Sequence, residues 1–211
     1  MSTVTVRGNA LAAVTPDRAE LSLALSHLAA DAATALDAIA ERSQRLEQIL
    51  SDHGFARTEW ATDGVTVAEE YQWRKDTNVL VGHRASTALT VTVRSAELVG
   101  PIIREAVTTT GASVRNLAWR VDADNPARRE LLAAAARDAK VRATAYVEAL
   151  GLRLGEVEAI SEAPLAAETG PQPQPMLRMA AAKTADGPDV SVSGGLVELY
   201  ADVTVRFAML P

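Results

Sequence analysis

The sequence contains no cysteine among its 211 residues. Disulfide bonds, thiolate nucleophiles and cysteine-ligated metals are therefore excluded, and no redox compartment can be inferred. Aromatic residues make up only 4% of the chain while alanine is abundant, so we expect helices that pack closely through small side chains. Acidic residues outnumber basic ones by 27 to 21, and the resulting net charge of −6 argues against a nucleic-acid-binding protein.

Long hydrophobic runs are also absent from the sequence. No stretch approaches the roughly 18 consecutive apolar residues of a membrane-spanning helix, so we expect no transmembrane segment. The first twenty residues lack the basic region and apolar stretch of a signal peptide. The sequence as given therefore predicts a cytoplasmic protein, with a periplasmic or cell-envelope location as the alternative if a leader has been removed.

The common catalytic and nucleotide-binding motifs are missing as well. The chain has no G-x-S-x-G, H-E-x-x-H, G-x-x-x-x-G-K or G-x-G-x-x-G. We therefore expect no enzyme, no catalytic residue and no bound cofactor.

The most informative stretch that is present runs from Asn78 to Arg94. Apolar residues occupy most odd positions, and small or polar residues occupy most even ones. This period of two is typical of a half-buried strand. Because seventeen residues is long for a strand, Gly82 is expected to mark a bend or bulge. We place this strand at the centre of an antiparallel sheet.

The other segments predict an α+β protein with helices packed on one side of antiparallel sheets. The order strand–helix–strand–strand–helix–strand indicates a ferredoxin-like core, which a long helix and two further strands follow. Phase changes in the alternation predict β-bulges at Gly8-Asn9 and at Asp63-Gly64. We expect one domain over residues 1–211, with one lobe at about 15–123 and a second at about 124–211 together with the strand at 1–14.

A proline-rich loop spans residues 164–195 and holds five of the nine prolines. A loop of this length in a compact domain is either functional or disordered. It contains an apolar island, which we expect to dock on a surface, either of the same chain or of a neighbouring copy. The island supplies three candidate interface residues: Met176, Leu177 and Met179.

Several segments, in this order, resemble the SIMPL domain family, which includes bacterial periplasmic immunogenic proteins. Val4-Thr-Val-Arg-Gly8 and Val14-Thr-Pro-Asp-Arg-Ala19 resemble the family's opening strand and turn. Gly82-His-Arg-Ala-Ser86, followed by Leu89-Thr-Val-Thr-Val93, resembles its "GYRASN…LTV" strand, with His83 in the usual tyrosine place. Further similar segments are Asp138–Ala143, Ala149–Gly151, Gly155–Val157, Ile160–Glu162 and Pro173–Ala182.

The resemblance covers nearly the whole chain. The departure that we note from the family is the signal peptide, which we do not recognise in this sequence. It implies no established catalytic residues. It implies self-assembly, with ring- or channel-like oligomers in some members, and links to stress tolerance and the cell envelope. We therefore expect a homo-oligomer, with envelope association as a further expectation that follows from the family.

Histidines are the remaining candidates for chemistry. His27 and His83 both fall on the apolar parity of their strands, and with Asp31 or Glu69 they form a conceivable metal site. The simpler interpretation is two separate, partly buried histidines, and we predict no metal. His53 at a helix end needs no further role. The cluster Asp122–Asn125 lacks the glycine and distal glutamate of a calcium loop and is explained by helix capping.

Trp73 completes the set of candidate interface residues, because it falls in the polar hairpin turn that we expect at residues 72–77, near Tyr71. We interpret the sequence as a non-catalytic, self-associating SIMPL-like protein. The alternative is a protein that binds a small molecule or metal in a pocket between its lobes, to which His27 and His83 contribute.

Overall fold

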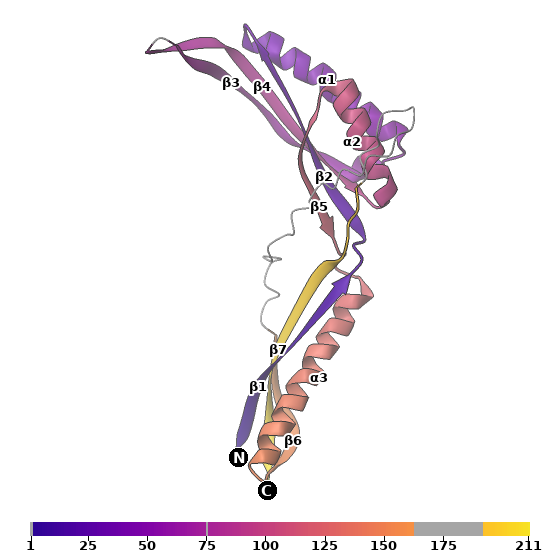
Figure 1. The fold of residues 1–211 in the computed structure, drawn as a ribbon, viewed down its shortest axis with the longest axis vertical. Coiled ribbons are helices and arrows are strands. Elements are labelled where there is room, and N and C mark those ends of the chain that lie inside the picture. Colours follow the sequence, from indigo (N-terminus) through magenta and orange to yellow (C-terminus); the bar gives the residue numbers. More distant parts are fainter. Residues whose placement is uncertain (1, 75, 163–191) are drawn as a thin grey trace, which may run out of the picture. The chain divides into compact units, whose positions relative to one another are not determined.

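The computed structural model describes residues 2–74, 76–162 and 192–211, which form an α+β fold with antiparallel sheets (Figure 1). The described residues divide into two compact units. A four-stranded unit contains β2, α1, β3, β4, α2 and β5, and a three-stranded unit contains β1, α3, β6 and β7. Each unit has a hydrophobic core of its own.

The four-stranded unit has the ferredoxin-like order that the sequence predicts. Its sheet runs β3-β4-β2-β5 with every neighbouring pair antiparallel, so β4 lies inside the sheet as expected. The elements are β2 (Arg18–Ala29), α1 (Ala32–Asp52), the short 3₁₀ turn η1 (Arg57–Glu59), β3 (Trp60–Arg74), β4 (Thr77–Val93), α2 (Ala96–Thr110) and β5 (Ser113–Arg120).

Alternation in β2 and β4 builds the core of this unit. Every second residue points toward the face that α1 and α2 cover, because successive side chains of a strand point to opposite faces. Leu89, Val91 and Val93 of β4 face inward, and all three are buried. They pack with large aliphatic side chains of the helices, including Ile39, Leu46, Leu50, Val99 and Ile102.

The helix ends of this unit follow the capping rules. The Asp31 carboxylate accepts a hydrogen bond from the Thr34 amide at 2.9 Å and caps the start of α1. This bond, together with one from the Thr34 hydroxyl, holds the pKa of Asp31 below its ordinary value. Gly111 ends α2 with a φ of 64°, in the left-handed region that favours glycine.

Arg42 of α1 satisfies carbonyl groups that would otherwise lack donors. Its guanidinium donates to the carbonyl oxygens of Thr110 at 2.6 Å, Ser26 at 2.9 Å and Gly111 at 3.0 Å. The last carbonyls of a helix have no intrahelical partner. Arg42 therefore joins the C-terminal end of α2 to α1 and β2.

The three-stranded unit contains β1 (Thr3–Val14), α3 (Pro126–Ala149), β6 (Arg153–Glu162) and β7 (Val197–Leu210). The strand order is β1-β7-β6, so the last strand pairs with the first and with β6. Asn125 caps α3 through its side-chain oxygen, as the capping interpretation predicts, and Pro126 stands at the first helical position.

Alanine and glycine bring α3 very close to this sheet. Ala135, Ala139 and Ala143 are fully buried on the helix. A Cβ atom at Gly8 of β1 would overlap the backbone oxygen of Ala135 and the backbone nitrogen of Ala139. Only glycine permits this approach, so the role of Gly8 is close packing of backbone against backbone.

The structure corrects one bulge prediction and confirms two others. The expected bulge at Gly8-Asn9 is wrong, because β1 pairs with β7 in unbroken register from Thr3 to Val14. The change of phase arises because Leu11 is an exposed apolar residue on the open face. Register shifts do occur beside Asp63-Gly64 and beside Gly82, where the sequence predicts them.

Candidate functional site

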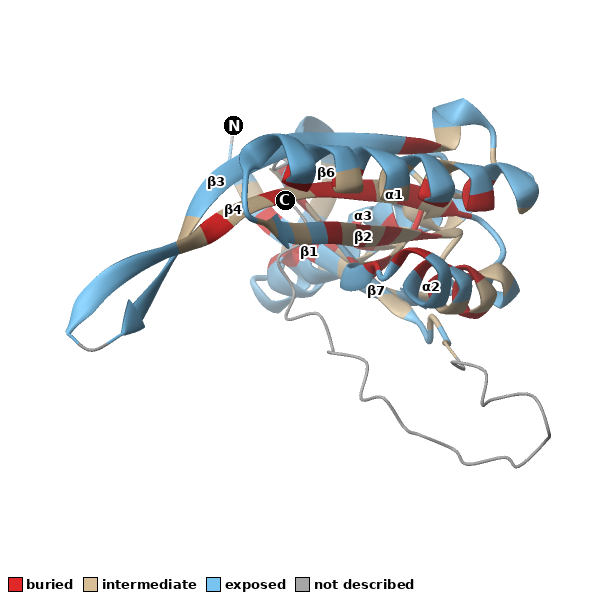
Figure 2. Ribbon diagram, turned by 90° about the horizontal axis from the view of Figure 1, so that it is seen from above, coloured by how far each residue is buried: buried red, intermediate tan, exposed pale blue. Residues whose placement is uncertain are grey.

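The outer half of the β3–β4 hairpin is the most distinctive exposed surface among the described residues. We call residues 65–74 of β3 and 77–84 of β4 the arm. Residues 77–82 pair with β3 alone, because β2 ends at Ala29, opposite His83. Figure 2 shows the arm as exposed and extending past the first turn of α1. Trp73 lies in strand β3, and the polar turn begins only after Arg74.

The two faces of the arm differ in chemistry. Cross-strand partners point to the same face of a sheet, so the register assigns each side chain to a face. Val65 and Val67 lie opposite Thr87 and Ala85, which point toward the helices. The same face of the arm carries Val65, Val67, Glu69, Tyr71, Trp73, Asn78, Leu80 and His83.

We call this surface the apolar face of the arm. Its five hydrophobic side chains are between 41% (Val67) and 71% (Trp73) exposed. Its one charged residue, Glu69, accepts a hydrogen bond from the Tyr71 hydroxyl at 2.6 Å, and this bond raises the pKa of Tyr71. The opposite face is mainly polar and carries Thr66, Ala68, Glu70, Gln72, Arg74, Val79 and Arg84.

The base of the arm is held by a charged clamp on the polar face. Arg84 donates to both carboxylate oxygens of Glu70, at 3.0 and 3.1 Å, and to the Ser26 hydroxyl at 3.2 Å. The bidentate contact lowers the pKa of Glu70 and raises that of Arg84. Gly82 lies beside the clamp with a φ of 147°, where a Cβ would overlap the Ala29 carbonyl oxygen.

His27 and His83 lie on neighbouring strands and on the same face, two register positions apart. His27 is opposite Ala85, and His83 is opposite Ala29 on one side and Glu69 on the other. The nearby carboxylates have other partners, since Asp31 caps α1 and Glu69 accepts from Tyr71. Across the residues that the structure describes, no group of three or more His, Asp or Glu residues could hold a metal ion.

The other sequence candidates have structural contacts. His53 Nε2 lies 2.8 Å from the Glu105 carboxylate, which joins the end of α1 to α2. Asn125 caps α3 and Asp122 precedes it, as the capping interpretation predicts. Met176, Leu177 and Met179 lie outside the described residues. Trp60 is buried at the start of β3, with the Arg57 guanidinium 3.9 Å from the centre of its ring.

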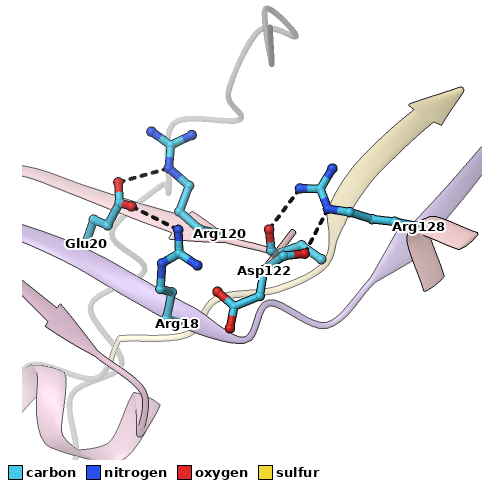
Figure 3. A network of polar contacts seen from close by, with 6 residues as sticks. Arg18, Glu20, Arg120, Asp122 and Arg128 are labelled. Atoms are coloured by element: carbon cyan, nitrogen blue, oxygen red, sulfur yellow. Dashed lines mark hydrogen bonds and ion pairs between the residues drawn. The ribbon is translucent and has the colours of Figure 1, made fainter. Parts of the chain in front are cut away.

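Polar networks within each unit tie strands and loops together (Figure 3). In the four-stranded unit, Glu20 of β2 accepts hydrogen bonds from Arg18 at 3.4 Å and Arg120 at 3.1 Å. In the three-stranded unit, Arg128 donates to the carbonyl oxygens of Val121 and Asp122, both at 2.8 Å. These contacts fix backbone positions within each unit.

A shallow hollow of about 300 Å³ lies between the outer side of α1 and the start of β3. Its lining is mostly polar: Gln44, Glu47, Gln48, Ser51, Phe55, Arg57 and Trp60. Because the Trp60 ring is covered by Arg57, the hollow offers no flat aromatic platform to a ligand.

Sequence reasoning identified Trp73 and missed the rest of the apolar face. The signal was present in the alternation of Val65, Val67, Glu69, Tyr71 and Trp73 along one strand. Such alternation predicts which residues share a face, but it does not show where the covering helix begins.

The helices of the described chain include none that is long and apolar enough to cross a membrane.

Comparison with known proteins places the chain beside one family. The family model SIMPL, described as a protein of unknown function (DUF541), matches residues 4–207. The match includes β1 except its first residue, β2 through β6 in full and most of β7. A comparison with curated proteins gives no match.

Proposed function

We propose, from the premise that the chain belongs to the SIMPL family, that this protein works by self-association and not by catalysis. The family assignment names no activity, so the proposal depends on the surface of the molecule. The possible link to stress tolerance and the cell envelope remains an expectation from the family resemblance alone.

The observation that carries the proposal is the apolar face of the arm. A two-stranded hairpin is at best marginally stable in water, and it gains stability when a hydrophobic face is covered. The arm exposes Trp73, Tyr71 and Leu80 beyond the helices of its own unit. Exposed hydrophobic patches of this kind mark interaction sites.

Charge supports the same interpretation. The clamp between Arg84 and Glu70 places paired charges on the polar face. On the apolar face, the Glu69 carboxylate accepts a hydrogen bond from the Tyr71 hydroxyl, so covering this face does not bury a charge without a polar partner, which would cost several kcal/mol. A surface of this composition favours a protein partner over nucleic acid, and the net charge of −6 agrees.

The test is the mass of the protein in solution. Sedimentation velocity and light scattering should give a mass above the 22.3 kDa of one chain. Trp73→Ser should weaken the assembly at least about tenfold, because aromatic anchors dominate such interfaces. Gln72→Ser, one residue away on the polar face, is the matched control and should leave the mass unchanged.

A mass of one chain at every concentration up to about 100 μM would contradict the proposal, since interfaces of standard size bind more tightly than this. An oligomer that is equally stable in the wild type and in Trp73→Ser would show that the protein self-associates, but through another surface than the apolar face of the arm.

A further inference from the structure

We propose that the apolar faces of two arms, one from each of two copies, pack against each other across a two-fold axis. This inference rests on the proposed self-association and specifies its partner surface. It assigns Val65, Val67, Tyr71, Trp73 and Leu80 to the contact, and it places Glu70, Gln72, Val79 and Arg84 on the solvent side.

The area available fits a second copy of the same arm. Tyr71 and Trp73 are 48% and 71% exposed, and aromatic side chains of this kind bury roughly 150–250 Å² each. With the three aliphatic side chains, the face offers on the order of 500 Å², against about 800 Å² per partner in an interface of standard size. The polar residues around the face supply the remainder as a rim.

The charge distribution favours a like surface as the partner. The ionisable side chains assigned to the face are Glu69 and Tyr71, which hydrogen-bond each other, and His83, which lies opposite Glu69. The one carboxylate of the face, Glu69, already accepts a hydrogen bond from Tyr71, so a strongly acidic or basic partner would find little opposite charge on this face. A second copy presents the same apolar surface, and a two-fold axis makes such a patch complementary to itself.

The residues on the outer edge of β3 also favour arms that pack through their faces over arms that pair edge to edge. Asp63, Glu69 and Glu70 stand on this edge strand, and the register shifts beside Asp63-Gly64 and after Glu70. Charges and bulges on an edge strand oppose the addition of another strand. Two arms that meet face to face, about 10 Å apart as stacked sheets do, avoid this obstacle.

The absence of cysteine allows a direct test in the full chain. Leu80 and Val79 are adjacent apolar residues of β4 with similar exposure, 46% and 41%, on opposite faces of the arm. Leu80→Cys and Val79→Cys are each treated with a bifunctional maleimide of about 10 Å span, the spacing of stacked sheets. Leu80→Cys should form covalent dimers at least about tenfold faster than Val79→Cys, since only its thiols face each other.

Every outcome of the experiment decides the inference. Equal rates, or faster cross-linking of Val79→Cys, in a protein that still has the oligomer mass would overturn the face-to-face contact and leave self-association standing. A wild-type mass of one chain would remove the proposed function together with the inference. If Leu80→Cys lowers the oligomer mass while Val79→Cys does not, the contact is supported, because only the apolar face is then sensitive.

Discussion

The two units of the chain cover their sheets in opposite ways. In the three-stranded unit, α3 presents alanines and meets Gly8 of β1 backbone to backbone. In the four-stranded unit, α1 and α2 present large aliphatic side chains such as Ile39, Leu46 and Ile102. The contact of α3 with β1 at Gly8 is thin and formed by small residues, whereas the core under α1 and α2 is thick and filled by large ones.

The difference predicts which substitutions each unit tolerates. A thick core loses stability when a large side chain is shortened, because a cavity remains. A thin interface has little side-chain volume to remove and loses stability when volume is added. All three tryptophans, Trp60, Trp73 and Trp119, lie in the four-stranded unit. Their fluorescence therefore follows that unit, while circular dichroism follows both.

The largest effect is expected from a cavity in the thick core. Leu89 is 3% exposed in β4, and Leu89→Ala should lower the free energy of unfolding by roughly 2–5 kcal/mol. The measurement is urea unfolding followed by tryptophan fluorescence. Thr90→Ala, on the opposite face of the same strand, is the control and should change the free energy by less than about 0.5 kcal/mol. An unchanged midpoint for Leu89→Ala would refute the core assignment.

The next largest loss of stability is expected when side-chain volume is added at the thin contact between α3 and β1. Gly8→Val places side-chain atoms where the Ala135 and Ala139 backbones lie, and it should cost about 1–3 kcal/mol or more. Urea unfolding by circular dichroism should show the loss. Ala13→Val adds similar volume on the open face of β1, where residue 13 is exposed, and should have almost no effect. If both valines are tolerated equally, the close contact of α3 with β1 is wrong.

Much of this architecture follows from the sequence, because the signals are local. The period of two locates β4, and Asp31, Asn125 and Gly111 are capping residues that fix helix ends. The ferredoxin-like order follows from the succession of strands and helices. Gly8 was misinterpreted, since a glycine within a strand predicts a bulge and close helix packing equally well until the helix position is known.

The candidate site was predicted less completely, for a related reason. Trp73 stands out because tryptophan is rare in this chain. Val65, Val67 and Leu80 are ordinary strand residues, and whether they are buried depends on where α1 begins relative to the arm. That relation comes from tertiary packing, so local periodicity cannot supply it.

A smaller loss of stability is expected when the Arg42 guanidinium, which joins α2 to α1, is removed. Arg42→Ala leaves the carbonyl oxygens of Ser26, Thr110 and Gly111 without their donor, and it should lower the free energy of unfolding by about 1–3 kcal/mol. Arg45→Ala, on the same helix, removes only an exposed ion pair with Glu41 and should cost less than about 0.5 kcal/mol. Equal losses in urea unfolding would show that Arg42 acts only as a surface charge.

The smallest loss of stability is expected when the Asp138 carboxylate is removed at the edge of the three-stranded sheet. Asp138 of α3 accepts hydrogen bonds from the Asn9 amide at 2.9 Å and from Arg142 at 2.8 Å. The Asn9 amide belongs to the edge strand β1, so the Asp138 carboxylate occupies a donor that would otherwise be open to another strand. These two contacts, the amide first, hold the pKa of Asp138 below its ordinary value of 3.8.

A lowered pKa in the folded state means that the ionised carboxylate stabilises the fold above pH 3.8 and that this contribution is lost as the pH falls through the folded-state value. Asp138→Asn should therefore lower the urea midpoint at pH 7, and the difference from wild type should shrink as the pH drops below 3.8. Glu148→Gln makes the same charge change on the same helix and controls for net charge. A difference between Asp138→Asn and wild type that stays constant from pH 7 to below 3.8 would show that the carboxylate's charge does not stabilise this edge.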